Sequence, residues 1–227
     1  MLKNKAIPAI GPAWAFLIAC AVSWLSCGPG LESREETDEG GYRTEYQVLP
    51  ETGEREGRAR NYAPDGRLLS EEQYRAGNLE GERRAFYPDG SVEIVENYRN
   101  GTFHGEYLTY DSTGHLKVRG TYTDGVMTGT WLRYWPNGRV KEAVAVADNA
   151  ENGPFREWYE SGTPSAAGTY ASGKESGTLW QWDEQANLIA IRDCGAEGCP
   201  ARWKRESGAN PPVPPPDMTR PPDLDGE

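Results

Sequence analysis

A glycine recurs every 24 residues through the middle of this chain and sets the register of an internal repeat. These leading glycines are Gly57, Gly81, Gly105, Gly129, Gly153 and Gly177. An aromatic residue stands five positions after each one: Tyr62, Phe86, Tyr110, Tyr134, Trp158 and Trp182. A further glycine stands nine positions after the leading glycine in the first five copies. A register kept without insertion over this length is typical of a repeat architecture, in which each copy is one small structural unit.

Each copy has the pattern of a β-hairpin. The first strand is expected from the leading glycine to just past the aromatic residue, as in residues 130–135. Turns such as Pro64-Asp65-Gly66 follow, because Pro presets φ and Gly accepts a positive φ. A second strand, such as residues 92–98 or 118–122, ends at a pair such as Asn100-Gly101, which is a strong hairpin signal. The fixed period predicts an all-β fold: an elongated antiparallel meander of stacked 24-residue hairpins, flanked by disordered termini.

The repeat domain is expected over residues 42–205, with atypical copies at both ends. Residues 42–49 fall where the second strand of a preceding copy would lie, and residues 188–192 are expected to be the closing strand. Cys194 and Cys199 follow that strand, and a close pair in an oxidising compartment favours a local disulfide. A metal site is the alternative. It would need two more ligands, and the two histidines of the chain are far away in sequence.

The repeat resembles the bacterial variant of the MORN repeat, which has the pattern Tyr-x-x-Gly-x-x-x-Gly-x-x-x-x-aromatic. The matching sets are Tyr74/Gly77/Gly81/Phe86, Tyr98/Gly101/Gly105/Tyr110, Tyr122/Gly125/Gly129/Tyr134 and Tyr170/Gly173/Gly177/Trp182. One copy departs from the pattern, with Val146 and Asn149 in place of Tyr and Gly. The resemblance implies a twisted sheet of stacked hairpins. Proteins with such repeats are often labelled YwqK-family antitoxins, so it also implies an antitoxin or immunity-like protein that neutralises a toxin by binding it.

The N-terminal segment has the parts of a secretory signal peptide. Two lysines are followed by a largely apolar stretch, residues 6–25, and then by Ser26 and Cys27. The segment resembles a bacterial lipoprotein signal, so residues 1–26 are expected to be removed and Cys27 to carry the lipid. Cys20 is the alternative: its preceding residues fit the lipobox pattern better, but Cys27 is better placed at the end of the apolar stretch. Plain secretion and an uncleaved membrane helix are further alternatives, and prolines in the stretch argue against the helix.

Two polar segments flank the expected repeat domain. Residues 27–41 begin with the expected lipidated cysteine and continue as a short acidic stretch, which is expected to be a flexible tether. Gly28 follows Cys27, which by resemblance to enterobacterial lipoproteins implies the outer membrane of the cell envelope, with the domain facing the periplasm or the cell surface. Residues 206–227 are rich in proline and are expected to be extended or disordered, as a spacer or as a ligand for an aromatic groove.

The charge of the chain argues against some partners. The full sequence has a formal net charge of −11, with 24 basic and 35 acidic residues. Removal of the signal peptide would take away two lysines and leave −13. Such a protein would be repelled by nucleic acid backbones and anionic lipid surfaces. We therefore expect no nucleic acid partner, and contact with a membrane only through the N-terminal lipid anchor.

Aromatic residues at two repeat positions differ from the rest. The rings five positions after the leading glycine occur in every copy, so they are expected to pack, with the repeated tyrosines, as a spine along one face. The rings two and six positions after the leading glycine are concentrated in the later copies, and early copies have Ala59, Ala63 and Arg83 there, with Tyr87 alone aromatic. They form the candidate binding face, because an open row of rings is typical of a protein or sugar contact. The alternative is that the tail or a second layer covers this face. The candidate residues are Tyr107, Trp131, Trp135, Phe155 and Tyr159.

The sequence contains no motif of an enzyme. It lacks a Gly-x-Ser-x-Gly elbow, a phosphate-binding glycine loop and a His-Glu-x-x-His metal motif. We therefore expect no catalytic residues, no metal and no cofactor. The expected function is a non-enzymatic envelope lipoprotein whose sheet binds or scaffolds an unknown protein or a cell-wall glycan, and the antitoxin described above is the alternative.

Overall fold

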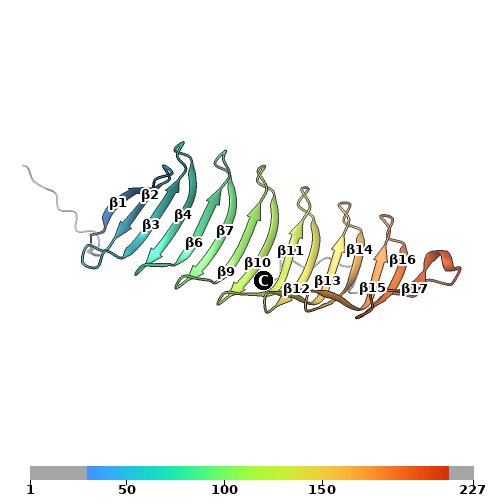
Figure 1. The fold of residues 1–227 in the computed structure, drawn as a ribbon. Coiled ribbons are helices and arrows are strands. Elements are labelled where there is room, and N and C mark those ends of the chain that lie inside the picture. The colour runs from blue at the N-terminus through green and yellow to red at the C-terminus, as the bar shows by residue number, and fades with distance from the viewer. Residues whose placement is uncertain (1–29, 215–227) are drawn as a thin grey trace, which may run out of the picture. The chain divides into compact units, whose positions relative to one another are not determined.

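The computed structural model describes residues 30–214, and this part of the chain forms 17 β-strands (Figure 1). A 3-10 turn, Arg205–Ser207, follows the last strand. The strands are β1 Glu32–Thr37, β2 Arg43–Val48, β3 Arg55–Tyr62, β4 Leu68–Arg75, β5 Asn78–Leu79, β6 Gly81–Phe86, β7 Val92–Arg99, β8 Thr102–Phe103, β9 Gly105–Tyr110, β10 Leu116–Thr123, β11 Val126–Tyr134, β12 Val140–Ala147, β13 Ala150–Trp158, β14 Pro164–Ala171, β15 Lys174–Trp182, β16 Leu188–Cys194 and β17 Ala201–Lys204.

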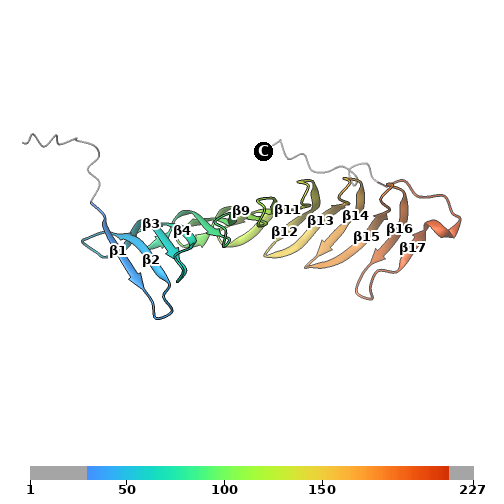
Figure 2. The same cartoon turned by 90° about the horizontal axis from the view of Figure 1, so that it is seen from above.

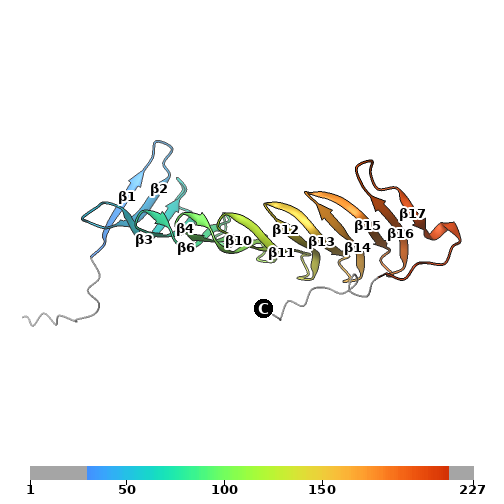
Figure 3. The ribbon, with the colours of Figure 1, turned by 90° about the horizontal axis from the view of Figure 1, so that it is seen from below.

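All the strand pairs are antiparallel and join neighbours in sequence, which confirms the predicted all-β meander. Strand β1 pairs with β2, β2 with β3, and so on to β16 with β17. The two-residue strands β5 and β8 are the first parts of the strands that continue as β6 and β9. Views from above and below show the same succession of hairpins, and in the described residues no second layer of strands or helices lies over either face (Figures 2 and 3).

Two kinds of turn connect the strands, and both follow the local sequence. In the turn after β3, Gly66 has φ +85° and its N–H donates to the carbonyl oxygen of Ala63 over 2.8 Å. In the turn after β7, Asn100 and Gly101 have φ +48° and +77°. Two consecutive positive φ angles define the type I′ turn, whose twist matches that of the flanking strands.

The leading glycines lie at positions where the strand pairing shifts register. Gly129 has φ +74°, and the pairing of β10 with β11 is irregular beside it, between Arg119 and Thr121. A β-bulge of this kind inserts an extra residue, and glycine adopts the positive φ without steric cost. The 24-residue recurrence of glycine is therefore a recurrence of bulges.

The N-terminal end of the sheet differs from the prediction. Residues 32–37 were expected to belong to a flexible tether, but they form β1, the edge strand of the sheet. The strand is held by polar contacts: Glu35 accepts a hydrogen bond from Arg43 over 3.1 Å, and Glu36 accepts one from the Tyr46 hydroxyl. Charged residues on an edge strand discourage pairing with other chains. Because β1 is polar and has no alternation of apolar residues, its composition is that of a linker. For this reason the sequence pattern did not predict a strand there.

The C-terminal end also extends further than expected. Residues 188–192 were expected to close the sheet, and they lie in β16, but β17 pairs with β16 beyond them. Cys194 and Cys199 stand at the two sides of the connection between these strands, where Gly195 and Gly198 form an isolated β-bridge.

Side chains alternate between two faces, which we name face A and face B. Face A carries the residues two and seventeen positions after each leading glycine, and face B carries the aromatic residues five positions after it. Phe155 and Tyr170 are in ring contact on face A, whereas Trp158 packs with Leu132 and Ala143 on face B. The expectation of one spine that combines both sets of rings is therefore wrong. Tyr170 pairs with the leading glycine Gly153, Trp158 stands five residues after that glycine on the same strand, and residues an odd number apart along a strand point to opposite faces.

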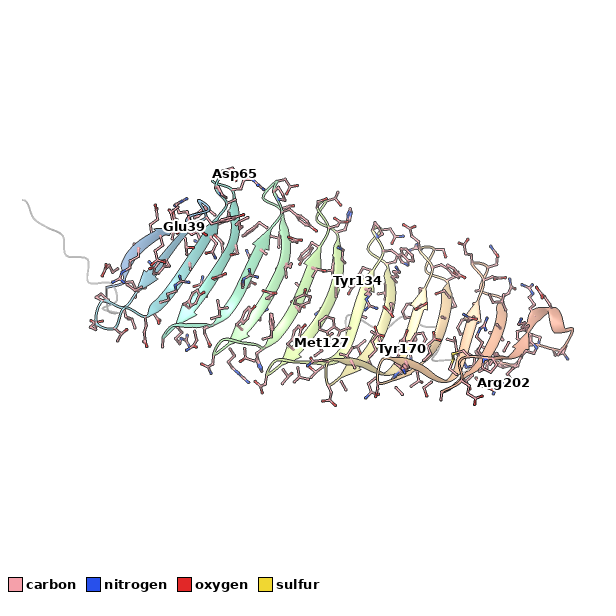
Figure 4. The ribbon with its side chains drawn as sticks, viewed as in Figure 1. Glu39, Asp65, Met127, Tyr134, Tyr170 and Arg202 are labelled. Atoms are coloured by element: carbon pink, nitrogen blue, oxygen red, sulfur yellow. A yellow bond between two sulfur atoms is a disulfide. The ribbon has the colours of Figure 1, made fainter. Side chains whose placement is uncertain are left out.

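The buried core is divided between the faces. On face A, one cluster is centred on Val144 and Phe155, and a smaller one on Val48 and Ala59. On face B, one cluster contains Trp158 and another contains Trp180, Trp182 and Ile191. Figure 4 shows side chains along the whole sheet, with Asp65 at the turn edge and Met127 and Tyr170 toward the opposite edge. Within residues 30–214, no helix has the length and apolarity needed to cross a bilayer.

Candidate functional site

Two of the five candidate binding residues are buried inside the sheet's own core. Trp131 is 9% exposed and Phe155 is 2% exposed. Each ring covers a glycine of a neighbouring strand: a Cβ on Gly120 would overlap the indole of Trp131, and a Cβ on Gly168 would lie 2.9 Å from Cε1 of Phe155. The prediction that these rings form an open binding row is therefore wrong, because the glycines leave room for the rings to lie flat on the backbone.

Tyr107 takes part in a continuous stack of rings on face A. Its ring centroid lies 5.6 Å from that of Trp131 and 5.8 Å from that of Tyr122. The stack continues from Tyr122 to Phe103 at 5.0 Å, and from Phe103 to Tyr98 at 4.6 Å. Burial raises the pKa of the Tyr107 hydroxyl, and the charge of Glu96 adds to this shift. The Tyr107 side chain is thus half-buried and packs between neighbouring copies.

The remaining candidates, Trp135 and Tyr159, connect one copy to the next. Nε1 of Trp135 donates to the carbonyl oxygen of Trp158 over 2.9 Å, and the hydroxyl of Tyr159 donates to the carbonyl oxygen of Trp182 over 2.8 Å. Tyr87 makes the same bond to Tyr110 over 2.9 Å. Each bond joins residues 23 apart. These rings therefore hold adjacent copies together, a role that the repeat spacing could have suggested.

The cysteines with predicted roles lie in different parts of the chain. Cys27 and its alternative Cys20 lie outside the described residues. Cys194 and Cys199 are joined as a disulfide, with Oε2 of Glu175 at 3.3 Å from the sulfur of Cys199. In the described part of the chain, these three residues are the set whose ligand atoms come close enough to hold a metal ion. Two sulfurs joined to each other are not thiolates, so this arrangement does not form a metal centre.

A polar groove lies on face B of the first copies. Its larger part has a volume of about 470 Å³ and lies on β1, β2 and β3. A smaller part, of about 240 Å³, continues over β3, β4 and β6. Arg58 lines both parts. The face B residues that line the groove are Ser33, Glu35, Glu45, Gln47, Arg58, Arg60, Glu71, Gln73, Glu82 and Arg84.

Ion pairs order the floor of this polar groove. Glu71 pairs with Arg58 and, over 3.0 Å, with Arg60. The Arg58 hydrogen bond lowers the pKa of the Glu71 carboxyl, and the Arg60 bond lowers it further against the effect of burial. Glu45 accepts hydrogen bonds from Arg43 and Tyr62, which lower its pKa. The carboxylates therefore stay ionised in moderately acidic solution, and the groove presents fixed charges of both signs.

Sequence reasoning missed the polar groove, although a signal for it exists. Six of its residues stand one, three, fourteen or sixteen positions after Gly57 or Gly81. At positions three and fourteen, later copies have Leu132, Ala143 and Ala167. Charged residues at positions that are apolar elsewhere in a repeat mark a surface that the fold itself does not require.

Comparison with known proteins supports the repeat assignment over part of the chain. No curated protein sequence matches the chain. Residues 79–100 and 103–124 each match the family model described as the MORN repeat variant. The two segments begin 24 residues apart, which is the spacing of the leading glycines, and they cover β6 and β7 and then β9 and β10. The chain therefore contains MORN-type repeats in these two segments.

Proposed function

We propose that this protein is a non-enzymatic, lipid-anchored binding protein of the bacterial cell envelope, and that the polar groove on β1 to β6 holds its partner. One observation carries this proposal. The rings of the later copies are used for packing and for contacts between copies, while the first copies keep a hollow lined by arginines and glutamates. A surface of this kind recognises a partner through charge-assisted hydrogen bonds.

The position of the polar groove suits an anchored protein. Glu32, the first residue of β1, lies five positions after Cys27. A fully extended chain covers about 3.3–3.6 Å per residue, so a lipid on Cys27 would hold β1 within about 18 Å of the membrane surface. The groove would then face partners that lie close to that surface, such as an envelope protein or the peptide and sugar groups of the cell wall.

Affinity capture tests the binding proposal. The tagged full-length chain is expressed in its native cells, purified from envelope extracts, and its partners are identified by mass spectrometry. Arg58→Glu reverses the charge that both parts of the groove share, and we expect it to reduce the captured partner at least tenfold. Arg67→Glu is the matched control, because Arg67 is an exposed turn residue paired with Asp65 and lies outside the groove. Equal capture by the two variants would contradict the proposal.

Two further arms of the experiment identify the partner class and the anchor. Digestion of the extract with a muramidase before capture removes a glycan partner and leaves a protein partner, and recovery of a toxin would favour the antitoxin function. Metabolic labelling with a fatty-acid analogue tests the anchor separately: Cys27→Ser should abolish the label and Cys20→Ser should keep it. The opposite result would move the lipid to Cys20.

A further inference from the structure

An aromatic groove lies at the C-terminal end of the sheet, on face B. Trp182 of β15, Leu188 of β16 and Trp203 of β17 form one side of it. Residues 208–209 and 211–214, which follow the 3-10 turn, form the other side, and the space between has a volume of about 580 Å³. Gly208 has φ +72°, a left-handed conformation that ends the turn. Arg205 fixes the turn through an ion pair with Asp183 over 3.0 Å.

The indole of Trp203 has an unused hydrogen-bond donor. Its Nε1 is buried, and within the described residues no acceptor bonds to it. Buried tryptophan N–H groups normally find a partner. The nearby segment Pro211-Pro212-Val213-Pro214 lines the same space. Proline has no N–H, so this segment offers carbonyl oxygens that its own neighbours cannot satisfy.

The burial of the segment shows where it meets the aromatic groove. Pro214 is half-buried, whereas Pro211 and Pro212 are exposed and Val213 is 89% exposed. A polyproline II strand has three residues per turn, so it presents only one residue in three to a given side. The segment therefore meets the aromatic groove at Pro214 and leaves its other side chains in water.

We propose that the aromatic groove is a binding site for a polyproline II strand, and that its resident ligand is Pro211–Pro214 of the same chain, with Trp203 Nε1 donating to a carbonyl oxygen of that segment. Aromatic-lined grooves bind such strands at low entropic cost, because the strand is already extended. Residue 211 lies eight positions after Trp203, so the local concentration of the segment is of millimolar order. The tail thereby covers the apolar end of the sheet beside the last edge strand, and it excludes external proline-rich ligands while it is bound.

Nuclear magnetic resonance of the indole N–H groups tests this proposal in the full-length chain. A tail variant carries Pro211→Ser, Pro212→Ser and Pro214→Ser, and the probe is a synthetic peptide with the sequence of residues 208–214. The Trp203 signal is assigned by its loss in Trp203→Phe. We expect hydrogen exchange at Trp203 Nε1 to be at least tenfold faster in the tail variant than in the native chain. The peptide should slow it again in the variant and leave the native chain unchanged.

Two controls separate binding from loss of fold. The indole signal of Trp135, which bonds the Trp158 carbonyl, should not change in the tail variant. Trp203→Phe placed in the tail variant keeps a ring and removes the donor, so it should weaken the peptide at least fivefold. The proposal is overturned if the peptide does not bind the tail variant, or if the proline substitutions leave Trp203 exchange unchanged. Protection that depends on protein concentration would also overturn it, because the ligand would then come from a second copy.

Discussion

The first and the last copies of the repeat share one backbone pattern but fill face A in different ways. Arg83 in the second copy and Phe155 in the fifth copy occupy the same position, two residues after the leading glycine. Around Arg83 the neighbours are Glu72 and Glu96, while around Phe155 they are Val144 and Gly168. The comparison shows that turns and bulges specify the hairpin. The side chains on face A can then be held either by a network of ion pairs or by rings that pack on glycines.

The copies that begin at Gly57 and Gly81 form what we name the charged half. In this half, one arginine connects two glutamates of neighbouring strands. Arg83 bonds Glu72 over 3.2 Å and Glu96 over 2.7 Å. Tyrosines complete the network, since the Tyr74 hydroxyl donates to Glu72 over 2.9 Å and the Tyr98 hydroxyl to Glu96 over 3.2 Å. Burial, with the charge of Glu96, raises the pKa of Tyr98 to about 12. This half is thus held by directional contacts that depend on every member.

The copies that begin at Gly129, Gly153 and Gly177 form what we name the apolar half. The largest expected effect on stability is the loss of a ring from this half. Phe155→Ala should lower the free energy of unfolding by about 3–5 kcal/mol, because it removes a fully buried ring and exposes the space above Gly168. Urea unfolding at low and at high salt measures this, and the loss should be the same in both, since no charge is involved. A cost below about 1 kcal/mol would mean that this ring is not part of the core.

The corresponding change in the charged half should cost less and depend on charge. Arg83→Met leaves Glu72 and Glu96 without their cation and should cost about 2 kcal/mol. Replacing both glutamates with glutamine in the same chain should recover most of this loss. Arg67→Met, at an exposed turn pair, is the control and should cost less than about 1 kcal/mol. If Arg83→Met and its control were equal, the ion network would not stabilise this half.

Local sequence predicts the common backbone well but not the way in which each face is closed. Strands and turns follow from residues close in sequence, such as Pro64-Asp65-Gly66 or Asn100-Gly101, and they were predicted. The covering of Gly120 by Trp131 joins residues on different strands, and it depends on which neighbour has no side chain. The same holds for the polar groove, whose charged residues come from separate strands. The edge strand β1 was not predicted, because its stability comes from pairing with β2 and not from its own composition.

The hydrogen bond that joins neighbouring copies should contribute the same free energy in both halves. In this it differs from the side-chain contacts on face A, which are ionic in one half and apolar in the other. Trp135→Phe in the apolar half and Tyr87→Phe in the charged half each remove one donor to a carbonyl of the next copy and keep a ring. Each should cost about 1 kcal/mol, the usual net value of one hydrogen bond. Thermal unfolding of the two variants makes the comparison. A large cost for one and none for the other would show that this contact is not a shared property of the repeat.

The smallest effects concern two carboxyls whose pKa values move in opposite directions. In the apolar half, burial raises the pKa of Glu157, and the charges of Glu142 and Glu175 add to it. In the charged half, the hydrogen bond from Arg58 lowers the pKa of Glu71. The folded protein therefore binds the Glu157 proton more tightly than the unfolded chain does, and the Glu71 proton more weakly.

These opposite shifts predict opposite responses to pH. Glu157 contributes stability that is fully present below its unfolded pKa and is lost as pH rises through its raised folded pKa, so Glu157→Gln should stabilise the protein at pH 7 and lose that advantage toward pH 4. Glu71 contributes stability that is present above its unfolded pKa and is lost as pH falls through its lowered folded pKa, so Glu71→Gln should destabilise the protein at pH 7 and have less effect in strong acid. Solvent screening limits both changes to less than about 1 kcal/mol.

Urea unfolding of the two variants and the native chain at pH 7, 5 and 4 gives the sign of each difference. The same sign for both variants at pH 7 would contradict the distinction between the two halves, because a carboxylate would then be equally well accommodated beside arginines and beside other carboxylates.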